Sequence, residues 1–193
     1  MKVALFGGSF DPVHKGHLAI AEEACRCCRF DRFFFVPAAL SPFKHPGTVS
    51  ADFRLKMLEE ALKGVPDLPV EIDRSEIDRG GLSFSIDTIR SVRNRFPEAS
   101  VTWIAGDDIL PDLPRWKEAD ELSRVSDFLV FRRTEGKIPV FPNGFRIRFL
   151  EIAPVPYSSS EIRRQIAAGI PPTAIPGLLP VTAAFIEKEG LYR

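Results

Sequence analysis

Residues 2–24 read KVALFGGSFDPVHKGHLAIAEEA, and this stretch predicts how the fold begins. Val3–Phe6 is a short apolar run that stops at two glycines, as a buried strand does. After the turn, apolar residues recur at helical spacing from about His17 to Cys28. We therefore expect a strand, a glycine-containing loop and a helix. Such a loop either merely connects the two elements or holds a phosphate chain at the start of the helix.

The same alternation of strands and helices continues along the chain. Dense apolar runs predict further strands, and amphipathic runs with serine caps or a glycine stop predict further helices. Ser50 is expected to cap one helix, Ser83 or Ser85 the next, and Gly190 to end the last. The strands are expected at about 33–37, 68–73, 100–106, 127–133 and 146–152, and the helices at about 50–62, 83–96, 159–168 and 181–189.

Strands that are apolar throughout and alternate with helices predict a parallel sheet covered on both faces. The expected fold class is therefore α/β: a single Rossmann-like, doubly wound domain over residues 1–193 with a mainly parallel central sheet and helices on both faces. The helical part at about 156–193 is expected to pack on the same core, because no linker separates it from the rest.

The composition is that of an ordinary globular protein, with 45% apolar and 27% charged residues among 193. Lys+Arg and Asp+Glu balance at 26 each, so there is no whole-chain basic field for a nucleic acid or an anionic membrane. No apolar stretch approaches the ~20 residues that span a bilayer, and no signal peptide is recognisable. Cys25, Cys27 and Cys28 do not form a disulfide framework or a metal site. We expect a reduced, cytoplasmic protein without membrane or nucleic-acid partners.

The opening loop has the features of an anion site. Gly7 and Gly8 lack a Cβ atom, so a phosphate could approach their backbone N–H groups closely. His14 and His17 flank Gly16 and would project toward the positive end of the helix dipole. The loop differs from the P-loop, which ends in Gly-Lys-Ser/Thr, and from the G-x-G-x-x-G dinucleotide fingerprint. A motor-type NTPase and a hydride-transferring dehydrogenase are therefore not favoured.

A second candidate anion site lies late in the chain, at YSSSEIRRQIAAG (157–169). Serine hydroxyls and the first N–H groups of a helix can together bind an anion. Arg163 follows one turn later with a guanidinium fork that suits phosphate. Taken alone, the same pattern also describes an ordinary capped surface helix. In combination with the opening loop, the anion site is the favoured interpretation.

GGSFDPVHKGH, residues 7–17, resembles the (His/Thr)-x-Gly-His signature of the nucleotidylyltransferase superfamily, and most closely its form in the bacterial nicotinate-nucleotide adenylyltransferases. The resemblance continues nearly end to end. Ala38 and Phe43 depart from it, where the family has Asn and His. The other segments that resemble the family are VPAALSPFK (36–44), Arg54 with Met57-Leu58, SFSIDTI (83–89), WIAGDDILPDLPRW (103–116), the serine-arginine segment above and FIEKEGLYR (185–193).

This resemblance implies roles for particular residues. His14, His17 and Arg163 would be catalytic, with the imidazoles and the guanidinium bonded to the phosphates. Trp116 would stack on a flat cationic pyridinium. The resemblance further implies that ATP is bound by Gly7, Gly8, Ser9, Phe10, Lys44, Gly106, Asp108, Ser158, Ser159 and Ser160, and nicotinate mononucleotide by Phe84, Ser85, Trp116 and Lys117.

The implied reaction is attack by the phosphate of nicotinate mononucleotide on the α-phosphorus of ATP. Deamido-NAD forms and pyrophosphate leaves, by direct in-line displacement without a covalent enzyme intermediate. Mg²⁺ would be bound through the ATP phosphates, with no metal site on the protein. Alternatives are nicotinamide mononucleotide or phosphopantetheine as acceptor, a CTP-dependent transfer to an alcohol phosphate, and a nucleotide-binding regulator without catalysis. The sequence leaves a homo-oligomer open.

Overall fold

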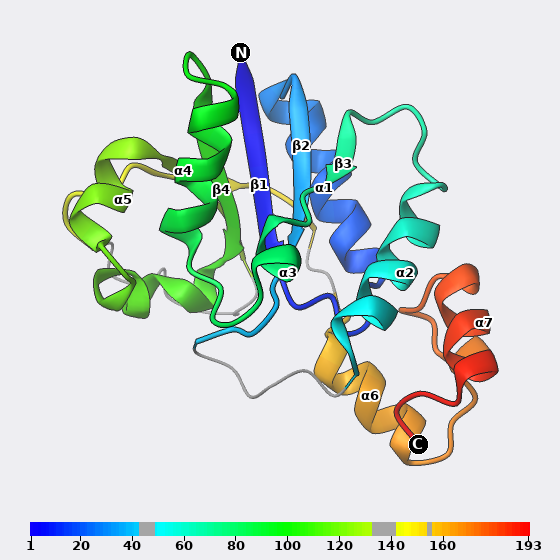
Figure 1. The fold of residues 1–193 in the computed structure, drawn as a ribbon. Helices are drawn as coiled ribbons and strands as arrows, with labels where there is room; N and C mark the ends of the chain where they lie inside the picture. The colour runs from blue at the N-terminus through cyan, green and yellow to red at the C-terminus, as the bar shows by residue number, and fades with distance from the viewer. Residues whose placement is uncertain (43–48, 133–141, 154–155) are drawn as a thin grey trace.

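Parallel strands form the centre of the fold (Figure 1). The computed structural model describes residues 1–42, 49–132, 142–153 and 156–193. Their strands form a six-stranded sheet in the order β3-β2-β1-β4-β5-β6, and every neighbouring pair is parallel. The strands are β1 (Lys2–Gly8), β2 (Arg32–Pro37), β3 (Val70–Ile72), β4 (Ser100–Gly106), β5 (Asp127–Phe131) and β6 (Ile147–Leu150).

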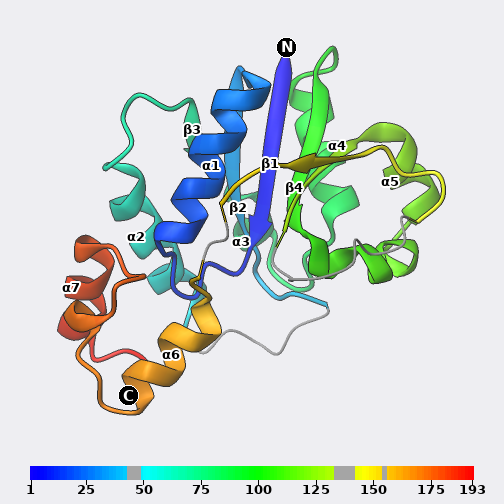
Figure 2. The same cartoon turned by 180° about the vertical axis from the view of Figure 1, so that it is seen from behind.

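Helices connect the strands and cover both faces of the sheet (Figures 1 and 2). The α-helices are α1 (Lys15–Cys28), α2 (Ala51–Leu62), α3 (Ser75–Arg79), α4 (Ser85–Arg95), α5 (Ala119–Val125), α6 (Ser159–Ala167) and α7 (Pro180–Glu189). Two segments are 3-10 helices, η1 (Asp107–Arg115) and η2 (Pro172–Ala174).

Each face of the sheet has its own apolar core, because successive side chains of a strand point to opposite faces. In β1, Ala4 and Phe6 pack with α1, α2, α6 and α7, whereas Val3 and Leu5 pack with α4, α5 and η1. Cys25 and Cys28 are partly buried against the first of these cores. The predicted α/β, Rossmann-like architecture with helices on both faces is confirmed.

Several local predictions need correction. The N-cap of α4 is Phe84, without a side-chain cap bond, and Ser85 is already the first helical residue. The helices α3, α5 and η1 were not predicted, since each is short and its apolar residues do not extend over several turns. By contrast, Ser50 caps α2 as expected, its side chain accepting a hydrogen bond from the N–H of Phe53. Gly190 ends α7 with a left-handed φ of 64°.

The order of the strands decides where a ligand can bind. The chain runs from β1 outward to β2 and β3 and then returns to place β4 on the other side of β1. In such sheets the carboxyl ends of the two strands at this reversal border a crevice. In both views of the ribbon, α6 lies beyond this end of the sheet (Figures 1 and 2).

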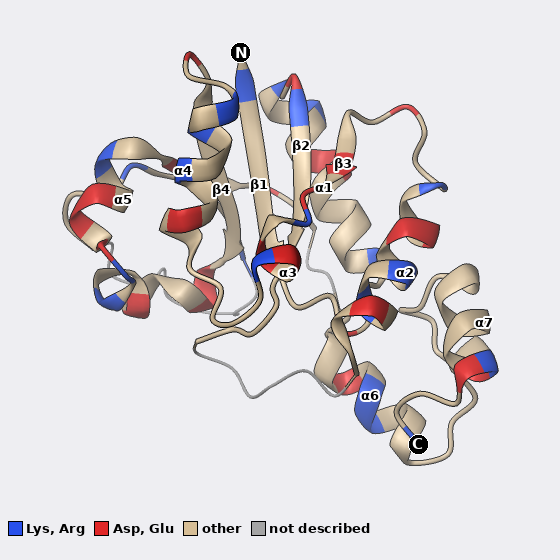
Figure 3. Cartoon of the chain, viewed as in Figure 1, with Lys and Arg blue, Asp and Glu red and all other residues tan. Residues whose placement is uncertain are grey.

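Charged residues of both signs are interspersed along the helices (Figure 3). The helices α2 and α4, for example, each carry basic and acidic residues. Within residues 1–42, 49–132, 142–153 and 156–193, no helix is both long enough and apolar enough to cross a lipid bilayer.

Candidate active site

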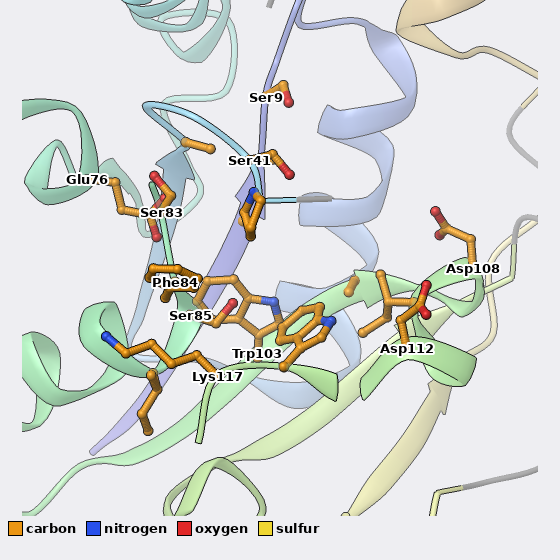
Figure 4. A pocket seen from close by; sticks show the side chains of 18 residues that line it. Ser9, Ser41, Glu76, Ser83, Phe84, Ser85, Trp103, Asp108, Asp112 and Lys117 are labelled. Carbon is orange, nitrogen blue, oxygen red and sulfur yellow. The ribbon is translucent and has the colours of Figure 1, made fainter. Parts of the chain in front are cut away.

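A pocket of about 260 Å³ lies at the carboxyl ends of β1 and β4 (Figure 4). Its wall comes from β1 and the loop after it, the segment after β2, the start of α4, and η1 with the residues after it. This is the position that the strand order predicts for a ligand. Among the predicted site residues, those that line the pocket are Gly7, Gly8, Ser9, Phe84, Ser85, Asp108, Trp116 and Lys117.

Two tryptophans form the floor of the pocket. The rings of Trp103, on β4, and Trp116 meet edge to face, with centroids 6.5 Å apart and an interplanar angle of 89°. Trp116 also meets Phe128 at 6.4 Å, which fixes the indole against the core. A Cβ atom on Gly7 would lie 2.3 Å from Cζ2 of Trp103. The absence of a side chain at Gly7 therefore makes room for the indole of Trp103.

Lys117 is held at the pocket wall. Its Nζ donates to both carboxylate oxygens of Asp87, at 3.1 and 2.9 Å, and lies 4.8 Å from the centroid of the Phe84 ring. The lysine side chain retains 39% of its exposure, so it remains accessible from solvent and from the pocket that it lines.

A buried carboxyl group lies on the opposite side of the pocket from Asp108 and Asp112 (Figure 4). Glu76, on α3, is 4% exposed and accepts a hydrogen bond of 2.5 Å from Oγ1 of Thr88. Burial raises the pKa of Glu76, although hydroxyl groups of Thr88 and Ser83 bond to it. Ser83 in turn accepts from the N–H of Ala39 at 2.9 Å. Glu76 thus ties α3 and α4 together at the pocket wall.

The two histidines of the opening loop lie side by side. His14 is the N-cap of α1, and its N–H donates to Nδ1 of His17 at 3.2 Å. Their ring centroids are 3.7 Å apart, and both side chains are buried. Because Nδ1 of His17 accepts a bond, the neutral imidazole carries its proton on Nε2. In this tautomer, Nε2 of His17 can donate a hydrogen bond.

Arg163 is bonded to the same loop from the far end of the chain. Its Nη1 donates to the carbonyl oxygen of Asp11 at 2.6 Å, and its Nη2 to Oγ of Ser160 at 3.3 Å. Oγ of Ser159 donates to the carbonyl oxygen of Pro12 at 3.0 Å. These bonds place the start of α6 against the loop of His14 and His17, as the sequence predicts. Ser158 caps α6, its Oγ accepting from the N–H of Glu161 at 3.2 Å.

The remaining predicted residues have different positions. Phe10 is 1% exposed and packs edge to face on His17, with centroids 5.0 Å apart, so only its backbone can meet a ligand. Gly106 is the last residue of β4 and pairs with Phe131 of β5. Lys44 lies outside the described residues. The side chains of His14, His17 and Arg163 do not line the pocket itself, which meets their loop at Gly7, Gly8 and Ser9.

Sequence reasoning assigned no site role to three residues that build the site. Trp103 is expected only as a core residue of a strand, because it lies in the middle of the apolar run that forms β4. Glu76 belongs to a five-residue helix with no detectable periodicity. Arg54 is matched only through the resemblance, yet its guanidinium is buried and donates to the carbonyl oxygens of Ser9 at 2.7 Å and Ala39 at 3.3 Å.

Comparison with known proteins agrees with this geometry. The model of the Cytidylyltransferase-like family matches residues 5–165. Over the whole chain, the sequence is 38% identical to a protein of Gemmatimonas aurantiaca and 36% identical to one of Thermus thermophilus, covering 93% and 100% of those proteins. Both carry the name "Probable nicotinate-nucleotide adenylyltransferase".

Solved structures show the same fold. The nicotinic acid mononucleotide adenylyltransferase of Plasmodium falciparum, complexed with NaAD, superposes with a TM-score of 0.77 at 17% identity, over 99% of this chain and 97% of that one. A complex of the same protein with APC gives a TM-score of 0.75. Together with the sequence identities, the strand order and the histidine loop, these matches show that the chain belongs to the nicotinate-nucleotide adenylyltransferase family, within the Cytidylyltransferase-like proteins.

Proposed function

We propose that this chain transfers the adenylyl group of ATP to nicotinate mononucleotide, which yields deamido-NAD and pyrophosphate. The observation that carries the proposal is the continuity of two sites: the wall of an aromatic pocket, at Gly7, Gly8 and Ser9, leads directly into the histidine loop. The pocket suits a flat ring, and the loop suits phosphates. The relatives of this chain bear the name of this activity.

The pocket offers a suitable environment for the nicotinate end of the acceptor. An indole face, that of Trp116, can stack on a pyridinium. The first residues of α4, Ser85 and Ile86, line the pocket, and the first N–H groups of a helix favour a negative charge. Lys117 adds an ammonium group whose position Asp87 fixes. These groups favour an acceptor that carries a carboxylate over one that carries an amide.

The histidine loop would bind the reacting phosphates. An oxygen of the acceptor phosphate bonds to the α-phosphorus of ATP, the bond from this phosphorus to the bridging oxygen breaks, and its electron pair leaves with pyrophosphate. A phosphate monoester is already anionic near neutral pH, so the protein need not remove a proton. We expect His14, His17 and Arg163 to donate hydrogen bonds to the oxygens on which charge accumulates. The guanidinium of Arg163 donates one bond to Asp11 and one to Ser160, and its other N–H groups can donate to these oxygens.

In the part of the chain that the structure describes, no three His, Cys, Asp or Glu side chains are grouped so that they could hold a metal ion. Mg²⁺ coordinated by ATP phosphates needs no such group, because this ion keeps most of its waters and a few phosphate oxygens as ligands. When bound in this way, the ion would neutralise charge on the departing pyrophosphate.

The proposal is tested by a panel of acceptors. The purified chain is given ATP and, in separate assays, nicotinate mononucleotide, nicotinamide mononucleotide or phosphopantetheine, and pyrophosphate release is measured. We expect kcat/KM for the acid to exceed that for the amide at least about tenfold. CTP replaces ATP in a parallel series, with an alcohol phosphate added as acceptor.

Two lysine variants make the panel specific to this site. Lys117→Met should lower the ratio of kcat/KM for the acid to kcat/KM for the amide, mainly by raising KM for the acid. Lys63→Met replaces an exposed lysine that is paired with Glu60 on α2, and it should leave this ratio unchanged. A preference for phosphopantetheine, the amide or CTP would contradict the proposal. ATP binding without pyrophosphate release from any acceptor would favour a regulator instead.

A further inference from the structure

The histidine loop is anchored by segments that are far away in the sequence. Between Ser9 and Lys15, backbone atoms of this loop bond to four other places in the chain. Three of these bonds use carbonyl oxygens of the loop, which orients its peptide planes. The carbonyl oxygens accept from other side chains: Ser9 from Arg54 at 2.7 Å, Asp11 from Arg163 at 2.6 Å and Pro12 from the hydroxyl of Ser159 at 3.0 Å. The fourth bond runs from the N–H of Lys15 to the carbonyl oxygen of Gly177 at 3.0 Å.

The side chain of Asp11 has an anchor of its own at the carboxyl-terminal end. Asp11 is 3% exposed, and its Oδ1 accepts a hydrogen bond of 2.6 Å from the hydroxyl of Tyr192. Burial, and then the charge of Asp11, raise the pKa of Tyr192, so this hydroxyl remains a donor throughout the neutral range. The pKa of Arg54 is lowered by burial and is partly restored by the negative charge of Asp11. Asp11 thus lies between a hydroxyl donor and a guanidinium.

Backbone strain marks both ends of this contact. Phe10, directly before Asp11, has a φ of 48°, and Tyr192 has a φ of 65°. Residues with bulky side chains seldom adopt the left-handed region, and they remain there only where surrounding contacts determine it. For Phe10 those contacts are its buried ring and the anchored loop. For Tyr192, which is next to the last residue, the bond to Asp11 is the contact that holds the hydroxyl.

We propose that Tyr192 is a positioning residue, which holds Asp11 and through it sets the backbone between Ser9 and His14 in the arrangement that adenylyl transfer requires. The proposal rests on the proposed function of the chain. The buried side chain of Leu191 already packs the carboxyl-terminal segment onto the core, and the ring of Tyr192 also lies against it. The hydroxyl of Tyr192 contributes no apolar packing, only the hydrogen bond that orients Asp11.

Tyr192→Phe tests the proposal, since it keeps the ring and removes only the hydroxyl. We expect kcat for pyrophosphate release to fall by about 10- to 100-fold, because a small displacement of reacting groups has effects of this order. KM for nicotinate mononucleotide should stay within about twofold, since the pocket of Trp116 lies apart from this contact. Thr173→Val is the matched control: it removes another hydroxyl of the carboxyl-terminal part, one that donates to Glu187 at 3.2 Å on the exposed surface.

A measurement without turnover keeps the two proposals separate. Hydrogen exchange by mass spectrometry should show faster exchange in peptides covering residues 9–17 of Tyr192→Phe, and not in Thr173→Val. Unchanged protection, or an unchanged kcat in an active enzyme, overturns the role of Tyr192. If the wild-type chain transfers no adenylyl group, the proposed function fails, while altered protection would still establish the anchor.

A double variant tests whether the two side chains act together. Asp11→Ala and Tyr192→Phe both remove the same bond, so their separate losses of kcat should not multiply when they are combined. Losses that multiply would show that the two residues act independently, and this result would contradict the proposal. Thermal unfolding of all variants should show folded proteins at the assay temperature.

Discussion

At the scale of the residue, His17 shows how a local contact prepares a chemical role. The N–H of His14 bonds to Nδ1 of His17, and the start of α1 sets this geometry. Phe10 and Phe6 lie against the imidazole, with ring centroids at 5.0 and 5.9 Å. The ring is therefore fixed in both orientation and tautomer before any ligand binds. Such preorganised donors lower the barrier because they need not reorient during the reaction.

The first prediction concerns this imidazole. His17→Ala should lose about 10²- to 10³-fold in kcat, the usual effect of removing one well-placed donor to a developing charge. His17→Gln should lose less, because its amide N–H₂ can reach the place of Nε2. Steady-state pyrophosphate release and circular dichroism of each variant are the measurements. Near-normal turnover in a folded His17→Ala protein would contradict the role of this residue.

At the scale of the element, Asp73 joins the end of β3 to two helices. Its Oδ1 accepts from the N–H of Ser75, the first residue of α3, at 2.9 Å. Its Oδ2 accepts from Nη1 of Arg95, in the last turn of α4, at 2.5 Å. Burial opposes ionisation of Asp73, but the bonds from Ser75 and Arg95 outweigh it and lower the pKa. One carboxylate thus holds together the elements that carry Glu76 and Phe84.

We predict that Asp73→Asn destabilises the fold by about 1–3 kcal/mol at neutral pH, because hydrogen bonds to a buried charge are lost. A carboxylate with a lowered folded-state pKa stabilises the fold above its unfolded-state value of 3.8. The difference between wild type and variant should therefore shrink as the pH falls below that value. Urea unfolding across this pH range measures the effect.

The control for this prediction is Glu60→Gln, which removes one partner of an exposed ion pair with Lys63. Exposed pairs contribute little to stability, so we expect this variant to unfold like wild type. A stability difference for Asp73→Asn that does not change with pH would mean that packing, and not the charge, is responsible.

At the scale of the whole molecule, the carboxyl-terminal segment completes a core that begins in β1. Residues after 156 supply seven buried apolar side chains to the cluster that also contains Ala4 and Phe6. These side chains come from α6, α7 and the segments around them. They are Ile162, Ile166, Ile175, Leu178, Ala183, Ile186 and Leu191.

From this shared core we predict that a chain ending at residue 155 does not fold. Burying one large apolar side chain contributes about 1.5–3 kcal/mol, and the net stability of a domain is only about 5–15 kcal/mol. Near-ultraviolet circular dichroism and gel filtration measure the outcome, and a chain that lacks only Arg193, which is exposed, serves as control. Cooperative unfolding of the shortened chain would show that residues 156–193 are a separate unit, contrary to the proposed single domain.

The sequence alone predicted the alternation of strands and longer helices along the chain, and the family. Periodicity over one element reports which side chains are buried, and a glycine, serine or histidine motif reports local backbone geometry. For this reason the strand at Val3–Phe6, the cap at Ser50 and the helix after Ser158 could all be predicted.

Only the tertiary structure decided how these parts meet. That Trp103 occupies the space beside Gly7, that Lys117 pairs with Asp87, and that Tyr192 reaches Asp11 are contacts between segments far apart in the chain. No local pattern encodes such pairs, because they follow from the order of strands in the sheet and from how the helices pack against it. The N-cap of α4, Phe84, was missed for the same reason, since no side chain caps the helix and the surrounding packing sets its boundary.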